Sequence, residues 1–130
     1  MEQLPKIETD RLILTELKAA DIPQIVKYAA NEKISAYTLN LPFPYSEKDA
    51  VYWINLANQG LKNKTHFIFA IRLKTRNEFI GGIGLTVEQN FFRAEIGYWI
   101  AEPFWNNCYT TEATKAIINF SFDTLGLILI

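Results

Sequence analysis

Hydrophobic and polar positions fall into blocks along the chain, and each block predicts one helix or strand. Residues 7–17 mix β-branched residues and leucines with polar ones, which predicts a first strand. Between residues 22 and 29, four apolar positions recur at the spacing i, i+3, i+4 and i+7. This spacing predicts an amphipathic helix that Asp21 caps and that runs to about Asn31.

The middle of the chain predicts a second helix and then three strands. Ser46 has an acidic residue three positions later and is followed by apolar residues on one helical face, which predicts a helix over 46–61. β-branched and aromatic runs at 66–73 and 79–88 flank a polar stretch and predict an antiparallel hairpin. A similar run at 92–100 predicts the next strand.

The last part of the chain predicts one more helix and one more strand. Residues 111–124 carry apolar side chains at helical spacing, Gly126 is placed to end that helix, and residues 127–130 begin a strand. The order is therefore strand, helix, helix, three antiparallel strands, helix, strand. This order predicts a single domain, residues 1–130, of the α+β (mixed α/β) class.

Composition and charge exclude several classes of function. The chain has 130 residues, 49% of them hydrophobic and 21% charged, as expected for one globular domain. Its 13 Lys and Arg nearly balance its 14 Asp and Glu, so we expect no nucleic-acid partner. The apolar runs are too short to span a membrane. The single cysteine, Cys108, predicts a reducing compartment, and we expect the cytoplasm.

Residues 94–113 hold the most informative pattern in the sequence. A predicted strand runs into a turn and then into a helix, which brings unpaired backbone N–H groups and the positive end of a helix dipole together. Such a junction favours anions, phosphates above all. Every strand-to-helix junction shares this property, so the pattern alone does not identify a site.

The order of residues resembles the Gcn5-related N-acetyltransferases, in particular their ribosomal-protein alanine acetyltransferase-like branch. Three segments resemble successive strands of that family: Glu8-Thr9-Asp10-Arg11-Leu12-Ile13-Leu14, Phe79-Ile80-Gly81-Gly82-Ile83-Gly84-Leu85 and Ala94-Glu95-Ile96-Gly97-Tyr98-Trp99-Ile100. Thr111-Glu112-Ala113 is similar to the start of the helix that follows the family's pyrophosphate loop. The resemblance covers nearly the whole chain.

This resemblance implies transfer of an acetyl group from acetyl-CoA to a primary amine. In the family, one strand pairs with the pantetheine arm, and the loop after it wraps the pyrophosphate with backbone amides. The resemblance places the arm on Trp99, Ile100 and Ala101. It places the pyrophosphate on Trp105, Asn106, Asn107, Cys108, Tyr109 and Thr110.

The pyrophosphate loop departs from the family pattern. Members of this branch commonly have glycines where Asn106 and Cys108 stand here. Glycine allows positive φ and lets the backbone approach a phosphate; Asn106 tolerates the left-handed region better than Cys108 does. We therefore expect weakened binding of CoA. The Cys108 thiol lies at a predicted helix start, which also allows the hypothesis that it is a nucleophile. The simpler hypothesis is an ordinary cysteine at the start of a helix.

Two carboxylates are candidates for catalysis. Amine attack on a thioester requires a base to take the ammonium proton. Glu95 is the candidate, because it shares a strand face with Gly97 and Trp99; the alternative is a carboxylate that orients its neighbours. Glu112 fits an acid favoured by the helix dipole better than a catalyst.

Aromatic side chains are the candidates for binding the acceptor. Tyr37, Phe43, Tyr45 and Trp53 are placed to wall an acceptor pocket, although they equally suit a core. His66 fits the end of a strand. With one His and one Cys in the chain, we expect no metal site.

The end of the chain supports a second hypothesis from a different class. The family's strand at Leu127 is followed by a further helix and strands, so the resemblance implies a domain that lacks this part. The alternative function is thus a catalytically impaired or inactive module that binds CoA weakly or binds a protein partner. We also expect a homo-oligomer that covers the apolar edge of residues 127–130.

Overall fold

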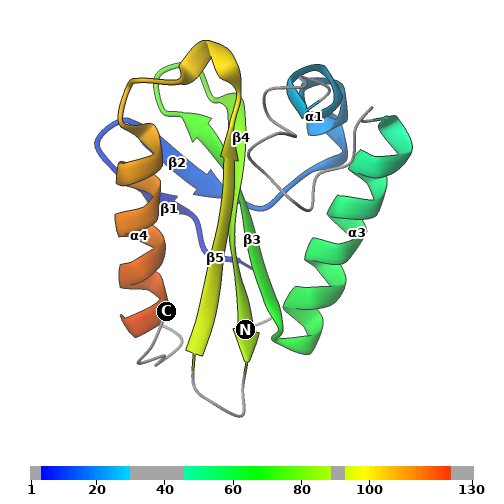
Figure 1. Cartoon of the computed structure of the whole chain (residues 1–130), viewed down its shortest axis with the longest axis vertical. Helices are drawn as coiled ribbons and strands as arrows, with labels where there is room; N and C mark the ends of the chain where they lie inside the picture. The colour runs from blue at the N-terminus through cyan, green and yellow to red at the C-terminus, as the bar shows by residue number, and fades with distance from the viewer. Residues whose placement is uncertain (1–3, 30–45, 89–92, 124–130) are drawn as a thin grey trace.

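The computed structural model describes residues 4–29, 46–88 and 93–123. Five antiparallel strands form one sheet in the order β1-β2-β3-β4-β5 (Figure 1). The strands are β1 (Ile7–Glu8), β2 (Leu12–Thr15), β3 (His66–Leu73), β4 (Glu78–Glu88) and β5 (Arg93–Ile100). The helices are α1 (Ile22–Ala29), α3 (Glu47–Asn63) and α4 (Tyr109–Asp123), with short 3-10 turns η1 (Ala19–Asp21) and η3 (Glu102–Phe104). The expected α+β class is confirmed.

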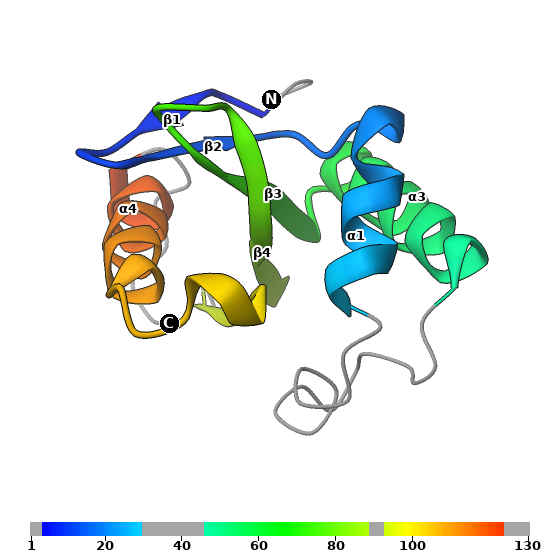
Figure 2. The ribbon, with the colours of Figure 1, turned by 90° about the horizontal axis from the view of Figure 1, so that it is seen from above.

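Helices cover both faces of the sheet. Helices α1 and α3 lie on one face and α4 lies on the other (Figure 2). Each face has its own hydrophobic cluster: Ile117 and Phe120 of α4 join one, and Ile25 and Ile54 of the other two helices join the second. Residues 67–73 of β3 are therefore all buried, which explains the nearly continuous apolar run there.

The central hairpin and the start of α3 follow the sequence patterns closely. Strands β3 and β4 pair from His66 opposite Thr86 to Leu73 opposite Glu78. Ser46 is the N-cap of α3, and its backbone N–H donates to the Asp49 carboxylate at 2.9 Å.

No helix in the described part of the chain is long and apolar enough to cross a membrane. The expected strand at 127–130 lies outside the described residues.

The prediction of one continuous strand over residues 7–17 is wrong. The chain forms two short strands, β1 and β2, which pair with each other around a turn at residues 9–11. The Thr9 hydroxyl accepts a hydrogen bond from the Leu12 N–H at 3.0 Å, and the Thr9 N–H donates to the Leu12 carbonyl at 2.9 Å. Threonine thus closes a tight turn, which the alternating apolar residues on both sides of it conceal.

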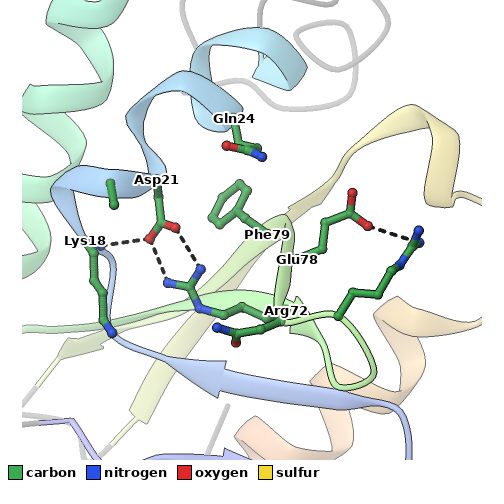
Figure 3. A pocket seen from close by; sticks show the side chains of 9 residues that line it. Lys18, Asp21, Gln24, Arg72, Glu78 and Phe79 are labelled. Atoms are coloured by element: carbon green, nitrogen blue, oxygen red, sulfur yellow. Dashed lines mark hydrogen bonds and ion pairs between the residues drawn. The ribbon is translucent and has the colours of Figure 1, made fainter.

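A buried ion pair joins α1 to the sheet (Figure 3). The Arg72 guanidinium on β3 donates to both carboxylate oxygens of Asp21, each at 2.7 Å, and its Nε donates to the Thr15 hydroxyl at 2.9 Å. The two charged side chains are 8% and 9% exposed. Asp21 also accepts the Lys18 N–H at 2.9 Å. Asp21 is not the N-cap of α1 that the sequence predicts: it is the last residue of η1, its carboxylate accepts from Lys18, the N-cap residue of η1, and it anchors the β2–α1 connection on β3.

We predict that Asp21→Ala lowers the free energy of unfolding by about 3 to 5 kcal/mol, because it leaves the Arg72 charge buried without its partner. Urea denaturation measures the change. The control is Lys6→Gln, which removes a pair with Glu8 whose side chains are 60% and 49% exposed and which should have a much smaller effect on stability. Equal losses in the two variants would contradict the assignment.

Candidate functional site

Strand β5 leads through a tight turn into α4. Among the described residues, β5 pairs only with β4, so it forms one edge of the sheet. The chain then passes through η3 and residues 105–108 before α4 begins at Tyr109. A pocket of about 320 Å³ lies at this turn, lined by Ile100 and by residues 104–110. All six residues assigned to the pyrophosphate line this one pocket.

The backbone of the turn is left-handed at two positions, Asn106 with φ 66° and Cys108 with φ 60°. These are the two positions at which the resemblance described above implies glycine. Asparagine visits this region more readily than most residues, whereas cysteine at positive φ stores about 1 to 2 kcal/mol of strain. The turn therefore keeps a backbone shape suited to glycine while carrying two side chains.

Side-chain hydrogen bonds support this backbone shape. The Trp105 indole N–H donates to the Ile100 carbonyl at 2.6 Å, which folds the turn back onto the end of β5. The Asn107 amide donates to the carbonyls of Phe104 and Trp105, both at 3.1 Å. The Ala101 N–H donates to the Ile80 carbonyl at 2.8 Å, so it is committed within the sheet. Hydrogen bonds within the turn and one bond to β4 thus fix the conformation of the turn.

Helix α4 begins directly after the second left-handed residue. The Glu112 N–H donates to the Cys108 carbonyl at 3.2 Å, which is the first bond of the helix. The N–H groups of residues 109–111 therefore have no partner inside the helix and, with the helix dipole, favour a negative charge at this end. The arrangement can hold a phosphate group through backbone amides.

Cys108 has an exposed thiol at this helix start. The one histidine of the chain, His66, belongs elsewhere: it begins β3, packs over Gly60 and lies 3.0 Å from the Thr65 hydroxyl through its Nδ1. His66 is thus a strand-end residue, and it is not placed to activate Cys108.

Glu112 in the first turn of α4 is bound by the turn between β1 and β2. It accepts hydrogen bonds from the Thr9 hydroxyl, and from the N–H and Nε of Arg11, both at 2.8 Å. Partial burial raises the pKa of the Glu112 carboxyl, but these bonds and the Arg11 charge outweigh burial and hold the pKa below its ordinary value of 4.5. Glu112 is therefore an ion-paired carboxylate that joins distant segments. Sequence reasoning assigned no role to Thr9 or Arg11.

Glu95, Gly97 and Trp99 lie on one face of β5, the face on which α3 packs. Glu95 is exposed, and no described residue comes within 4 Å of the Cβ position of Gly97. Trp99 is only 6% exposed and packs against Phe79 and Trp53, with ring centroids 5.8 and 6.0 Å away. Among the described residues, its indole N–H has no hydrogen-bond partner. Along this face of β5, the Glu95 carboxylate is followed by the open position at Gly97 and then by the buried indole N–H of Trp99.

Trp53 reaches this face from α3. Its ring lies over β4, where a Cβ on Gly82 would come within 2.5 Å of it. The glycine therefore makes room for the indole. Trp53 is partly exposed and packs on Trp99, which is two positions along the same strand face from Gly97. The other proposed acceptor residues, Tyr37, Phe43 and Tyr45, lie outside the described residues.

A second pocket, of about 580 Å³, lies over the buried ion pair (Figure 3). Its lining includes Lys18, Gln24, Glu78 and Phe79. The Arg72 and Asp21 charges in it neutralise each other, and Glu78 lies 3.1 Å from Arg76. The groups at this pocket are thus largely paired with one another.

Comparisons with known proteins agree with this geometry. Residues 11–130 match the family model of the acetyltransferase (GNAT) domain. The chain is 31% identical over 124 residues to the uncharacterised N-acetyltransferase YoaA of Bacillus subtilis, an alignment that covers 95% of this chain and 70% of that protein. The chain therefore belongs to the GNAT acetyltransferase family.

Solved structures show the same fold. A protein described as a ribosomal-protein-serine acetyltransferase from Vibrio cholerae superposes with a TM-score of 0.83 at 22% identity, over 99% of this chain and 74% of that one. Spermidine N-acetyltransferase from Vibrio cholerae, solved in complex with CoA and spermine, superposes with a TM-score of 0.74 at 21% identity, over 92% of this chain and 68% of that one.

We predict that Glu112→Gln lowers the free energy of unfolding at pH 7 by about 1 to 3 kcal/mol, because charge-assisted hydrogen bonds are lost. Since the pKa of Glu112 is lowered on folding, its contribution is complete above about pH 4.5 and disappears as the pH falls through the folded-state pKa. Urea denaturation at several pH values should show the gap to wild type closing in acid. Glu16→Gln, at an exposed carboxyl, is the control; a gap that is constant with pH would contradict the prediction.

Proposed function

We propose that the protein transfers the acetyl group of acetyl-CoA to a primary amine, on a protein N-terminus or a small molecule. The observation that carries the proposal is the turn at residues 105–108, left-handed at Asn106 and Cys108, which leads from the edge strand β5 into the N-terminus of α4. Family membership and the CoA bound to a structural neighbour support the same cofactor.

In this proposal the cofactor binds mainly to backbone. The pyrophosphate oxygens accept hydrogen bonds from backbone N–H groups of residues 105–110, which form the turn and the start of α4. The pantetheine arm runs along the end of β5 at Trp99, Ile100 and Ala101, where no other described strand pairs with the outer edge of β5. The Ala101 N–H and the Ile100 carbonyl already have partners within the chain, which leaves the other backbone groups of this edge for the arm. Edge strands bind extended groups through exposed N–H and C=O groups, as they bind peptides.

The reaction needs a proton acceptor and a route for the leaving group. The amine nitrogen attacks the thioester carbonyl carbon, the C–S bond breaks, and the nitrogen loses a proton while the thiolate gains one. We assign the base to Glu95, which is exposed beside the open position at Gly97 on β5. Glu95 takes the proton from the ammonium form of the acceptor, directly or through water.

We place the acceptor on the face of β5 that carries Glu95, Gly97 and Trp99, with Trp53 as one wall. An aromatic wall suits the apolar stem of an amine or the side chain of a peptide N-terminus. The indole N–H of Trp99 is a buried donor without a described partner, and such groups usually find one.

We predict that the 130-residue chain releases CoA from acetyl-CoA in the presence of an acceptor amine, with acetylated product identified by mass spectrometry. The panel of acceptors contains polyamines, alkylamines and peptides with free N-termini. Glu95→Gln should lower kcat by about 10²-fold or more, because the general base is removed. Asp123→Asn, an exposed carboxyl at the end of α4, is the control and should retain wild-type kcat.

The outcomes separate the two classes of function. Turnover that depends on Glu95 supports the enzyme. Calorimetric binding of acetyl-CoA without turnover of any acceptor supports the impaired module, and absence of binding contradicts the enzyme and leaves only a module that binds a protein partner.

We further predict that Cys108→Gly binds acetyl-CoA more tightly than wild type, by about threefold to tenfold, because glycine adopts the φ of 60° without strain and removes a Cβ beside the phosphate site. Calorimetric titration measures the affinity. Cys108→Ala removes the thiol but keeps the Cβ, so it should bind as wild type does. If glycine and alanine behave alike, the backbone strain at this position does not limit binding.

A further inference from the structure

We propose that Arg11 is a positioning residue for acetyl-CoA: through Glu112 and Tyr109 it holds the start of α4 in place and neutralises the carboxylate that would otherwise repel the pyrophosphate. This inference rests on the proposed function, since it concerns how α4 accepts the cofactor. Arg11 lies on the turn between β1 and β2, and it is assigned no contact with the reacting atoms.

The first step of the argument is the carboxylate of Glu112. The three hydrogen bonds that it accepts from described residues come from the turn at residues 9–11: the Thr9 hydroxyl, the Arg11 N–H and the Arg11 Nε. The Glu112 side chain is 19% exposed, so this contact is largely shielded from water. The first turn of α4 is thus bound to a segment about a hundred residues earlier in the chain, at a separation of 101 to 103 positions.

The second step is the ring of Tyr109. The Arg11 guanidinium carbon lies 4.5 Å from the centroid of this ring, within the range of a cation–π contact. Tyr109 is the first residue of α4 and follows the left-handed Cys108 directly. One arginine therefore contacts the helix at its first residue and at Glu112, on either side of the free N–H groups of Thr110 and Thr111.

The third step is electrostatic. A carboxylate in the first turn of a helix is stabilised by the helix dipole, but it competes with any anion that must bind at the same end. Repulsion between Glu112 and a pyrophosphate is long-ranged in a partly shielded site. The Arg11 charge cancels the Glu112 charge, so the positive end of α4 remains available. The arginine side chain is itself 44% exposed beside the turn.

A contact that only stabilises the fold predicts a different result from a contact in which the charge of Arg11 matters. If the contact only braces the fold, Glu112→Gln weakens the three hydrogen bonds from the turn, whereas Arg11→Gln removes only the Nε bond and the contact with Tyr109, so Glu112→Gln should weaken cofactor binding at least as much as Arg11→Gln. If the charge of Arg11 matters, Arg11→Gln leaves an unneutralised carboxylate, whereas Glu112→Gln leaves a positive charge near the phosphate. The two variants should then differ in affinity even where they lose similar stability.

The experiment is calorimetric titration of CoA into the full chain, together with KM for acetyl-CoA and kcat. We expect Arg11→Gln to raise the Kd for CoA and the KM for acetyl-CoA by about tenfold, while kcat at saturation stays within about twofold of wild type. Glu112→Gln should bind CoA at least as tightly as wild type. Arg11→Lys should recover part of the affinity that Arg11→Gln loses. Lys6→Gln removes an equal charge from an exposed ion pair on the neighbouring strand and should leave Kd unchanged. Circular dichroism verifies that each variant is folded.

Three results overturn the inference. Weakening by Glu112→Gln that equals or exceeds the weakening by Arg11→Gln leaves only a mechanical tie, and an unchanged Kd in Arg11→Gln removes the role altogether. In both cases wild type still binds CoA, so the proposed function stands. Failure of wild type to bind CoA overturns the proposed function and this inference with it.

Discussion

The burial of β3 on both faces is the constraint on which the rest of the molecule depends. Residues 67–73 cannot be shielded by one layer of helices, so α1 and α3 must cover one face and α4 the other. The chain enters α4 from the edge strand β5, and the connection must turn sharply around the end of the sheet. The left-handed residues of that connection, and the amides at the start of α4, follow from this geometry.

Patterns local in the sequence predicted most of the fold. The hairpin of β3 and β4 and the helix that begins after Ser46 agree with periodicity and capping, since neighbouring residues determine both. The split of the first strand at Thr9 was missed because a hydroxyl closes that turn. The role of Asp21 was missed because its partner, Arg72, is 51 residues away, and no local pattern identifies such a pair.

The candidate site was predictable to a similar extent. The resemblance implies glycine at positions 106 and 108, and both residues do adopt positive φ. The side chains that hold this turn were not foreseen, because the Trp105 bond to Ile100 and the Arg11 contacts with Glu112 and Tyr109 depend on the folded arrangement. Catalytic and acceptor roles remain proposals for the same reason: they concern groups that meet only around a substrate.

The contact between the β1–β2 turn and α4 also bears on the order of folding. The β3–β4 hairpin joins residues close in sequence, whereas Thr9 and Arg11 meet Glu112 across 101 to 103 positions. Closing so long a loop costs more chain entropy, and contacts of this kind form after local ones. The start of α4 is then fixed only when both ends of the described chain have come together. During synthesis, a nascent chain would form the β3–β4 hairpin before the turn that leads into α4 is held in its final place.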